Sequence, residues 1–257
     1  MLYLIDSHCH IHESSYPLDP VDVIRRAKEV GVKKIICVGT DDKSSTEAIK
    51  FSTEHDNAWA IVGVHPHEAK HGLGRVPDLI AQNTNSNVEV TKLIGIGEIG
   101  LDYFYNHSSR DNQVEIFNRQ IELAIKHDLP ISFHVREAFE DFWSIFDNFH
   151  GLRGVLHSYT DSTKNLERAL ERGLYIGVNG IATFNKNQEQ EAMYRAIPIE
   201  RLLLETDSPF LTPVPNRGKV NEPAFVADVA RYLSNLYDQP IEKLTEITSQ
   251  NTQKLFF

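Results

Sequence analysis

The 257-residue chain carries a formal net charge of −10, with 41% hydrophobic and 24% charged residues, proportions that are ordinary for a globular protein. The acidic balance argues against a broad basic face for gripping duplex nucleic acid. No apolar stretch approaches the length needed to span a membrane, so we expect no membrane partner. The length suits one large α/β domain, which we expect to cover residues 1–257.

Cysteine usage and the first residues bear on the compartment. Cys9 and Cys37 are the only cysteines, too few for a disulfide framework. The segment Met1–Asp6 has no basic region and no small-residue cleavage site, which is unlike a signal peptide. We therefore expect a cytoplasmic protein, with Cys9 and Cys37 as packing residues.

Short apolar runs alternate along the chain with amphipathic segments. The runs are continuous, as in strands buried on both faces; they cover 3–6, 34–39, 58–65, 93–98, 130–136, 154–158, 174–179 and 201–207. Helical spacing is found over 20–30, 44–54, 113–126, 137–146, 162–172, 188–196, 223–236 and 241–256, whereas 72–92 has no clear pattern.

Strict alternation of strand and helix predicts a parallel sheet. Eight strands in this length indicate an α/β fold, a single (β/α)₈ TIM barrel, with an extra C-terminal helix after the eighth strand. A doubly wound open sheet is the competing architecture. No glycine-rich dinucleotide fingerprint follows the first strand, which weakens that alternative.

His8 and His10 stand one residue apart at the end of the first strand. Residues i and i+2 of a strand share a face, so both imidazoles should project together while Cys9 points the other way. Two convergent imidazoles form half of a metal site. Their structural alternative is a pair of polar residues at a strand end.

Ionisable side chains also stand at the ends of other predicted strands. They are His65, Glu98, His134, His157 and Asp207. Each has a structural alternative; Asp207, for example, could cap the segment that follows it. Together they are informative, because ionisable groups seldom occupy buried strand ends without partners and these types are metal ligands.

The set can serve two cations, with Glu98 shared between them. The first cation would be held by His8, His10, Glu98 and Asp207. The second would be held by Glu98, His134 and His157. Paired cations can hold the attacking and the leaving oxygen of a displacement, and Asp207 is the best placed general base. We expect Glu98 and Asp207 to be the catalytic carboxylates.

Two further residues fit an anionic substrate. Arg136 follows His134 by two residues, so its guanidinium can clamp a phosphate; a salt bridge to Glu137 or Glu140 is the equal alternative. His65 can donate to an oxyanion. His67 is expected to support the site or lie at the surface.

These segments resemble the TatD family of metal-dependent hydrolases and deoxyribonucleases, among the amidohydrolase-like TIM barrels. The matching segments lie in family order over essentially the whole chain: 4–10, 63–67, 95–102, 130–136, 157–159, 204–211 and 217–223. The resemblance implies His8, His10, Glu98, His134, His157 and Asp207 as ligands of divalent metal ions, and phosphodiester hydrolysis on DNA, from an end. His12 departs from the family's usual Asp or Asn, and either tunes the site or is exposed.

The leading hypothesis is a phosphodiesterase that uses two divalent metal ions, Mg²⁺, Mn²⁺ or Zn²⁺, as a 3′-to-5′ exodeoxyribonuclease. The partner would be DNA or another phosphodiester substrate, bound at an end. The sequence does not decide between DNA and RNA. The alternative is a binuclear hydrolase of an amide, lactone or aminoacyl ester bond. A third hypothesis, a structural metal protein, fits poorly because closed zinc sites use four protein ligands. The sequence leaves the oligomeric state open, with a monomer favoured.

Overall fold

The computed structural model describes residues 2–84, 92–185 and 187–257. The chain divides into two compact units, which are described separately. Unit 1 contains the residues up to Cys37, His157–Leu255 and Phe257; unit 2 contains Val38–Leu156 and Phe256. The prediction of one domain over the whole chain stays a prediction.

Unit 1 holds the first two and the last two strands. Its strands are β1 (Leu4–Cys9), β2 (Val32–Val38, whose last residue belongs to unit 2), β7 (Tyr175–Val178) and β8 (Leu202–Leu204). Its helices are α1 (Pro20–Glu29), α6 (Thr163–Glu171), α7 (Ile181–Phe184), α8 (Gln188–Ala196), η2 (Ile199–Arg201), η3 (Pro223–Phe225), α9 (Val226–Leu236) and α10 (Ile241–Phe256, whose last residue belongs to unit 2).

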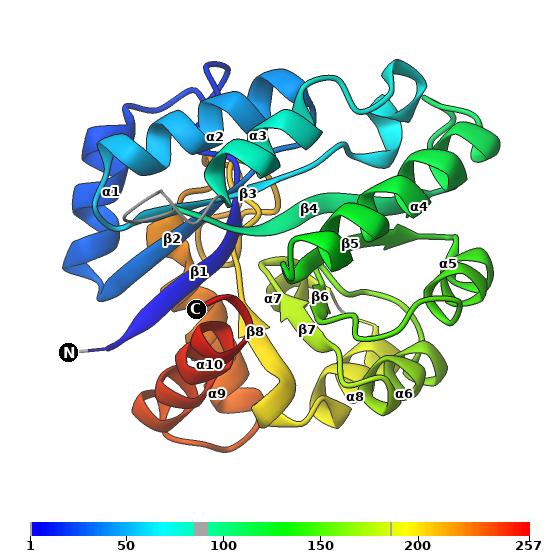
Figure 1. Cartoon of the computed structure of the whole chain (residues 1–257). Helices are drawn as coiled ribbons and strands as arrows, with labels where there is room; N and C mark the ends of the chain where they lie inside the picture. The colour runs from blue at the N-terminus through cyan, green and yellow to red at the C-terminus, as the bar shows by residue number, and fades with distance from the viewer. Residues whose placement is uncertain (1, 85–91, 186) are drawn as a thin grey trace. The chain divides into compact units, whose positions relative to one another are not determined.

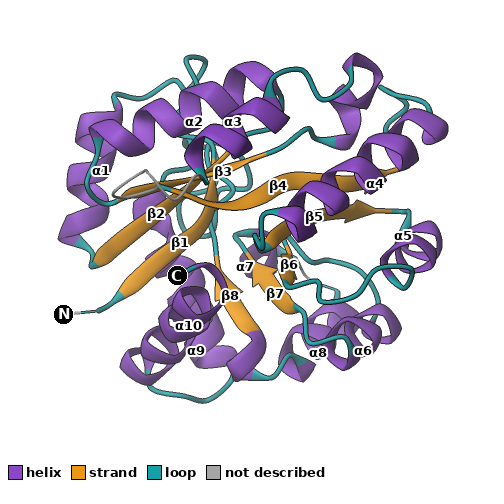
Figure 2. Ribbon diagram, in the orientation of Figure 1, coloured by secondary structure: helices purple, strands orange, loops and turns teal. Residues whose placement is uncertain are grey.

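The strands of unit 1 run parallel. Strand β1 pairs with β2 and β7 pairs with β8, while a bridge between Cys9 and Ser208 joins the end of β1 to the chain after β8. Helix α9 packs against both β1 and β8, as Figure 2 shows. The backbone therefore brings the ends of β1 and β8 together, although they lie about 200 residues apart in the sequence.

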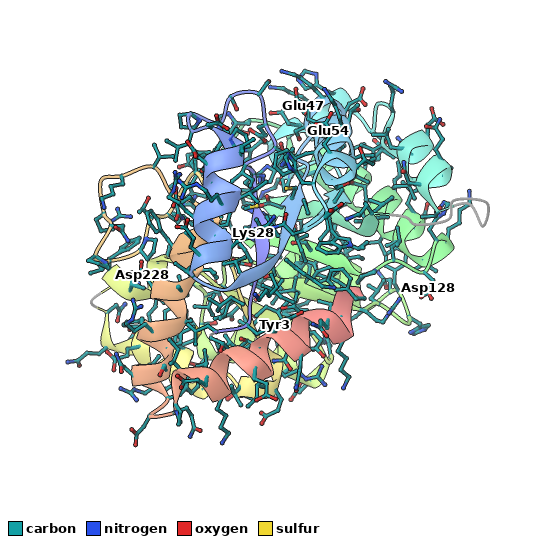
Figure 3. The ribbon with its side chains drawn as sticks, turned by 90° about the vertical axis from the view of Figure 1, so that its left-hand side faces the viewer. Tyr3, Lys28, Glu47, Glu54, Asp128 and Asp228 are labelled. Atoms are coloured by element: carbon teal, nitrogen blue, oxygen red, sulfur yellow. The ribbon has the colours of Figure 1, made fainter. Side chains whose placement is uncertain are left out.

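The start of β1 is fastened to α10. Ser249 donates its hydroxyl to the Tyr3 carbonyl at 2.9 Å, and Gln253 donates to the Tyr3 hydroxyl at 2.9 Å. Figure 3 shows Tyr3 beside this helix. The extra C-terminal helix predicted from the sequence is thus present, with bounds that match the prediction, and it secures the first strand.

Unit 2 holds the central strands. They are β3 (Ala58–Val62), β4 (Leu93–Asp102), β5 (Ile131–Arg136) and β6 (Gly154–Leu156), paired in parallel in that order. Its helices are α2 (Asp42–Glu54), η1 (Pro66–His71), α3 (Val76–Asn83), α4 (Arg110–Lys126) and α5 (Phe139–Phe146). Helix α4 packs along β4 (Figure 1). All ten residues of β4 are buried, as expected of a strand covered on both faces.

Side-chain caps explain where several helices begin. The Asp19 carboxylate accepts the Val21 N–H at 2.8 Å before α1, and Asp41 forms a capping box with Ser44 before α2. Helix α1 ends before Gly31, which has a φ of +100°. A Cβ there would lie 2.3 Å from the Leu2 carbonyl oxygen, so only glycine fits.

The predicted fold class is confirmed: within the described residues, eight parallel strands alternate with helices, the pattern of a (β/α)₈ TIM barrel. Strand β4 continues to Asp102, four residues beyond the prediction, because Gly100–Asp102 pairs with His134–Arg136 of β5. Helices α3 and α7 were not predicted. Part of the unclear stretch 72–92 lies outside the described residues.

None of the described helices has both the length and the apolar character that crossing a membrane requires.

Aromatic side chains form the densest part of the unit 2 core. Phe142 of α5 is fully buried and contacts Phe117, Phe133, Trp143 and Phe146 with ring centroids 4.8–5.7 Å apart. Such pairs add to the free energy gained by burying apolar surface. This cluster packs α4 and α5 against β5, the strand that carries His134.

We expect Phe142→Ala to lower the free energy of unfolding by about 3–5 kcal/mol, because it removes buried surface and leaves a cavity. The measurement is urea unfolding followed by circular dichroism. Ile125→Ala on α4 is the control, since Ile125 is 46% exposed and should change stability by less than about 0.5 kcal/mol. Equal effects of the two substitutions would contradict the packing described.

Candidate functional site

The first cluster lies in unit 1 and consists of His8, His10, His157 and Asp207. The Nε2 atoms of His8 and His10 are 3.3 Å apart. Asp207 Oδ1 lies 3.3 Å from His10 Nε2 and 3.8 Å from His8 Nε2. The predicted common orientation of His8 and His10 is confirmed. Cys9, between them, is fully buried and donates its thiol to the Ile36 carbonyl at 3.5 Å.

Backbone hydrogen bonds between the ends of β1 and β8 position this cluster. The Asp207 N–H donates to the His8 carbonyl at 2.9 Å, and the His10 N–H donates to the Ser208 carbonyl at 2.8 Å. Asp207 has a φ of +58°, a left-handed conformation that is uncommon for a non-glycine residue and is often found at functional sites. The two strand ends thus fix the carboxylate beside both imidazoles.

A buried carboxylate that sequence reasoning missed, Asp6, reinforces the same junction. Asp6 accepts hydrogen bonds from the Thr206 N–H at 2.9 Å and the Thr206 hydroxyl at 2.6 Å. Burial raises the pKa of Asp6 to about 8, against the lowering effect of these hydrogen bonds. Asp6 was visible in the sequence only as the last residue of an apolar run.

His157 completes the first cluster by stacking on His8, with ring centroids 4.0 Å apart and planes 15° apart. Its Nδ1 lies 3.6 Å from Glu205 Oε1. The Glu205 carboxylate is fully buried and accepts the Ser158 N–H at 2.6 Å. The 3.6 Å separation between Glu205 and His157 is longer than a hydrogen bond, so the contact between them is an electrostatic one.

The Asp207 carboxylate stays ionised in this surrounding. Burial alone would raise its pKa, but the hydrogen bond from His10 and the positive charges of His157, His8 and His10 lower it below the usual range. An ionised carboxylate among imidazoles is a ready metal ligand and proton acceptor.

The second cluster lies in unit 2 and consists of His65, which follows β3, Glu98, which lies within β4, and His134, which lies within β5. Glu98 Oε1 lies 2.6 Å from His134 Nδ1 and 3.5 Å from His65 Nε2. The His67 backbone N–H donates to His65 Nδ1 at 3.1 Å, which assigns the proton of a neutral His65 to the Nε2 that faces Glu98.

Asp102, at the end of β4, supports this cluster. Its Oδ2 lies 3.0 Å from His134 Nε2 and 3.1 Å from His67 Nε2. Its Oδ1 accepts the backbone N–H groups of Phe104 and Tyr105 at 3.0 and 3.1 Å. Sequence reasoning missed this role, although the length of β4 would have placed Asp102 level with Arg136 of β5.

The ionisation of these groups suits metal binding. Burial would raise the pKa of Asp102, but hydrogen bonds and the charges of His134 and His67 lower it below the usual range. Burial, with the charge of His134, lowers the pKa of His65 to about 4, and burial lowers the pKa of His67. His65 is therefore neutral at pH 7, the form of imidazole that binds metals.

The donor atoms of both clusters fit divalent cations. Ligand atoms from His8, His157 and Asp207 lie within 4.8 Å of one another, and so do those of the second cluster. Four ligands at about 2.0–2.2 Å in a tetrahedron are about 3.4 Å apart, close to the 3.3–3.8 Å separations among His8, His10 and Asp207. Imidazole and carboxylate donors suit Zn²⁺, Mn²⁺ and similar ions.

Each unit thus gathers predicted residues: His8, His10, His157 and Asp207 in one, and His65, Glu98 and His134 in the other. The sharing of Glu98 between two cations stays a prediction.

The predicted substrate-binding residue Arg136 lies over the Phe104 ring, 3.8 Å from its centroid. His12 is only 7% exposed, with its ring 6.3 Å from that of His10, so of its two alternatives the exposed one is excluded.

We expect Asp102→Ala to lower the free energy of unfolding by about 2–4 kcal/mol, because it leaves two imidazoles and two backbone N–H groups without their acceptor. Urea unfolding in the presence of EDTA separates this effect from metal loss. The matched control is Asp141→Ala. Asp141 accepts the Tyr103 hydroxyl at the exposed surface, so its loss should cost less than about 0.5 kcal/mol. The same small loss in both variants would refute the supporting role of Asp102.

Comparison with known proteins identifies the family. The sequence profile described as TatD related DNase matches residues 5–257. The chain is 36% identical to the uncharacterised metal-dependent hydrolase YabD of Bacillus subtilis, over 98% of each chain. It is 33% identical to the 3′-5′ ssDNA/RNA exonuclease TatD of Erwinia tasmaniensis, over 98% of this chain and 99% of that one. The crystal structure of the TatD homologue YJJV from Escherichia coli matches with a TM-score of 0.89 and 26% identity, covering 98% of this chain and 97% of that one. The chain therefore belongs to the TatD family of metal-dependent hydrolases.

Proposed function

We propose that this hydrolase cleaves phosphodiester bonds at the 3′ ends of DNA, and that RNA ends are also candidate substrates. The observation that supports it most is the pair of compact imidazole–carboxylate clusters, each suited to a divalent cation. A relative that covers the whole chain carries the name 3′-5′ ssDNA/RNA exonuclease. The acidic net charge of −10 fits recognition of an end better than gripping of a duplex.

In this proposal the protein holds two divalent cations, Mg²⁺, Mn²⁺ or Zn²⁺. His8, His10 and Asp207 hold one, His134 and His157 hold the other, and Glu98 serves both. The distances among His8, His10 and Asp207 support the first assignment. The assignment of Glu98 to both cations, and of His157 to the second, rests on the sequence and the family resemblance.

Bound cations would neutralise phosphate charge and make a water acidic enough to lose its proton near neutral pH. In the proposal, Asp207 accepts that proton as an ionised carboxylate. His65 holds Glu98 through its Nε2 and presents a neutral ring. Arg136 supplies positive charge to the substrate from the end of β5.

We expect the purified protein to shorten single-stranded DNA from its 3′ end in the presence of Mg²⁺ or Mn²⁺, and Asp207→Asn to slow this by about 10²–10⁴-fold because the general base is lost. Gel analysis of oligonucleotides labelled at the 5′ end follows the products. Asp22→Asn, at an exposed carboxylate of α1 paired with Arg25, is the matched control and should keep full activity.

Failure of any divalent metal to support shortening at enzyme excess would reject this function. Turnover of an amide, lactone or aminoacyl ester under the same conditions would then favour the alternative binuclear hydrolase.

Metal content tests the two clusters separately. We expect the native protein to hold two divalent ions per chain, and His10→Ala and His134→Ala to lose about one each because each removes a ligand from a different cluster. Inductively coupled plasma mass spectrometry after gel filtration gives the stoichiometry. His150→Ala, at an exposed histidine, should keep both ions. One ion in the native protein, or two in both ligand variants, would contradict the assignment.

A further inference from the structure

Two large aromatic side chains are exposed beside the second cluster, in the loop after β4. Phe104 is 48% exposed and Tyr105 is 43% exposed. Their rings lie 4.7 Å apart, edge to face. Apolar groups of this size gain nothing from exposure to water, and the metal clusters do not use them.

Arg136 adds a positive charge to the surface formed by Phe104 and Tyr105. Its guanidinium carbon lies 3.8 Å from the Phe104 ring centroid and 5.0 Å from that of Tyr105. The contact is a cation–π interaction. We call Phe104, Tyr105 and Arg136 the aromatic platform.

The platform is held in place by the carboxylate that supports the second cluster. Asp102 Oδ1 accepts the backbone N–H groups of Phe104 and Tyr105, while Asp102 Oδ2 lies 3.0 Å from His134 Nε2. The Tyr105 ring also packs edge to face on His67, with centroids 5.3 Å apart. One residue thus fixes the platform relative to Glu98 and His134 within one unit.

The chemistry of the platform matches a nucleobase. Every base has a π-face that stacks on an aromatic ring, and a nearby arginine adds a cation–π contribution and attracts the adjoining phosphate. Two rings and one guanidinium are far smaller than a stable protein interface. We propose that Phe104, Tyr105 and Arg136 bind the unpaired bases next to the bond that is cleaved, in single-stranded nucleic acid.

This inference rests on the proposed function and adds to it the residues that bind the bases of the substrate. A base at a single-stranded end is free to stack on the platform, whereas a base inside a duplex is already stacked and paired and must be unpaired first. Stacking is also tolerant of sequence. The platform therefore selects unpaired ends and accepts any base.

Kinetics with two substrates test the platform. We expect Phe104→Ala/Tyr105→Ala to raise KM for a single-stranded oligonucleotide by about 5- to 100-fold, with kcat nearly unchanged, because stacking holds substrate and transition state alike. Hydrolysis of methyl p-nitrophenyl phosphate, a phosphodiester without a base, should be unchanged. Phe104→Trp should keep a low KM, and Phe104→Leu, which keeps apolar bulk without a π-face, should raise it.

Phe257→Ala is the matched control. Phe257 is a half-exposed aromatic with a cation, Lys34 Nζ, 3.4 Å from its ring centroid, and it lies in unit 1. Its loss should leave KM for both substrates unchanged. Thermal unfolding of every variant confirms that the fold is kept, and the single variant Phe104→Leu tests the platform if the double variant does not fold.

Photocrosslinking gives a readout that does not depend on turnover. An oligonucleotide with 5-iodouracil at its 3′ end should form an adduct within residues 103–110, found by mass spectrometry, and Phe257→Ala should not change it. If the native protein cleaves the oligonucleotide while the Phe104 and Tyr105 variants keep its KM and the adduct forms elsewhere, the platform is wrong and the proposed function stands. If the native protein cleaves neither phosphodiester, both fail.

Discussion

The hydrogen bond between a buried carboxylate and a histidine ring is the interaction on which the candidate site depends. Asp102 plays this part for His134 and His67. Imidazoles gathered at the ends of buried strands would otherwise turn to satisfy their own polar atoms. Asp102 thereby orients His134 in the second cluster, so that its Nδ1 lies beside Glu98.

Buried acidic side chains also hold the backbone near the clusters. Asp6 accepts both polar hydrogens of Thr206, which holds the end of β8 against β1 and sets the backbone from which Asp207 projects. Asp102 likewise binds the backbone of the Phe104–Tyr105 loop. In each unit, a carboxylate outside the predicted ligand set links the metal-binding side chains to the segment that follows the strand.

The sequence predicted the fold well because each buried parallel strand is a continuous apolar run, and most of the predicted strands end in histidine or carboxylate side chains. It predicted His8, His10, Glu98, His134, His157 and Asp207 for that second reason. The supporting roles of Asp102 and Glu205 were not predictable, because they depend on side chains that meet across different strands. The contact of Arg136 with the Phe104 ring was not predictable for the same reason. The two residues lie 32 positions apart, and the pairing of Asp102 with Arg136 between β4 and β5 brings them together.

The acidic net charge and the aromatic platform together indicate how the proposed substrate would be bound. A net charge of −10 argues against binding nucleic acid through a broad field of lysines and arginines. Under the proposed function, binding then comes from contacts that do not scale with net charge, which are cations at the cleaved bond and stacking of neighbouring bases. The placement of Arg136 agrees with this, because its charge lies directly over the exposed Phe104 ring. Under the proposed function, such an enzyme would engage the few nucleotides at an end and would bind the rest of the strand weakly.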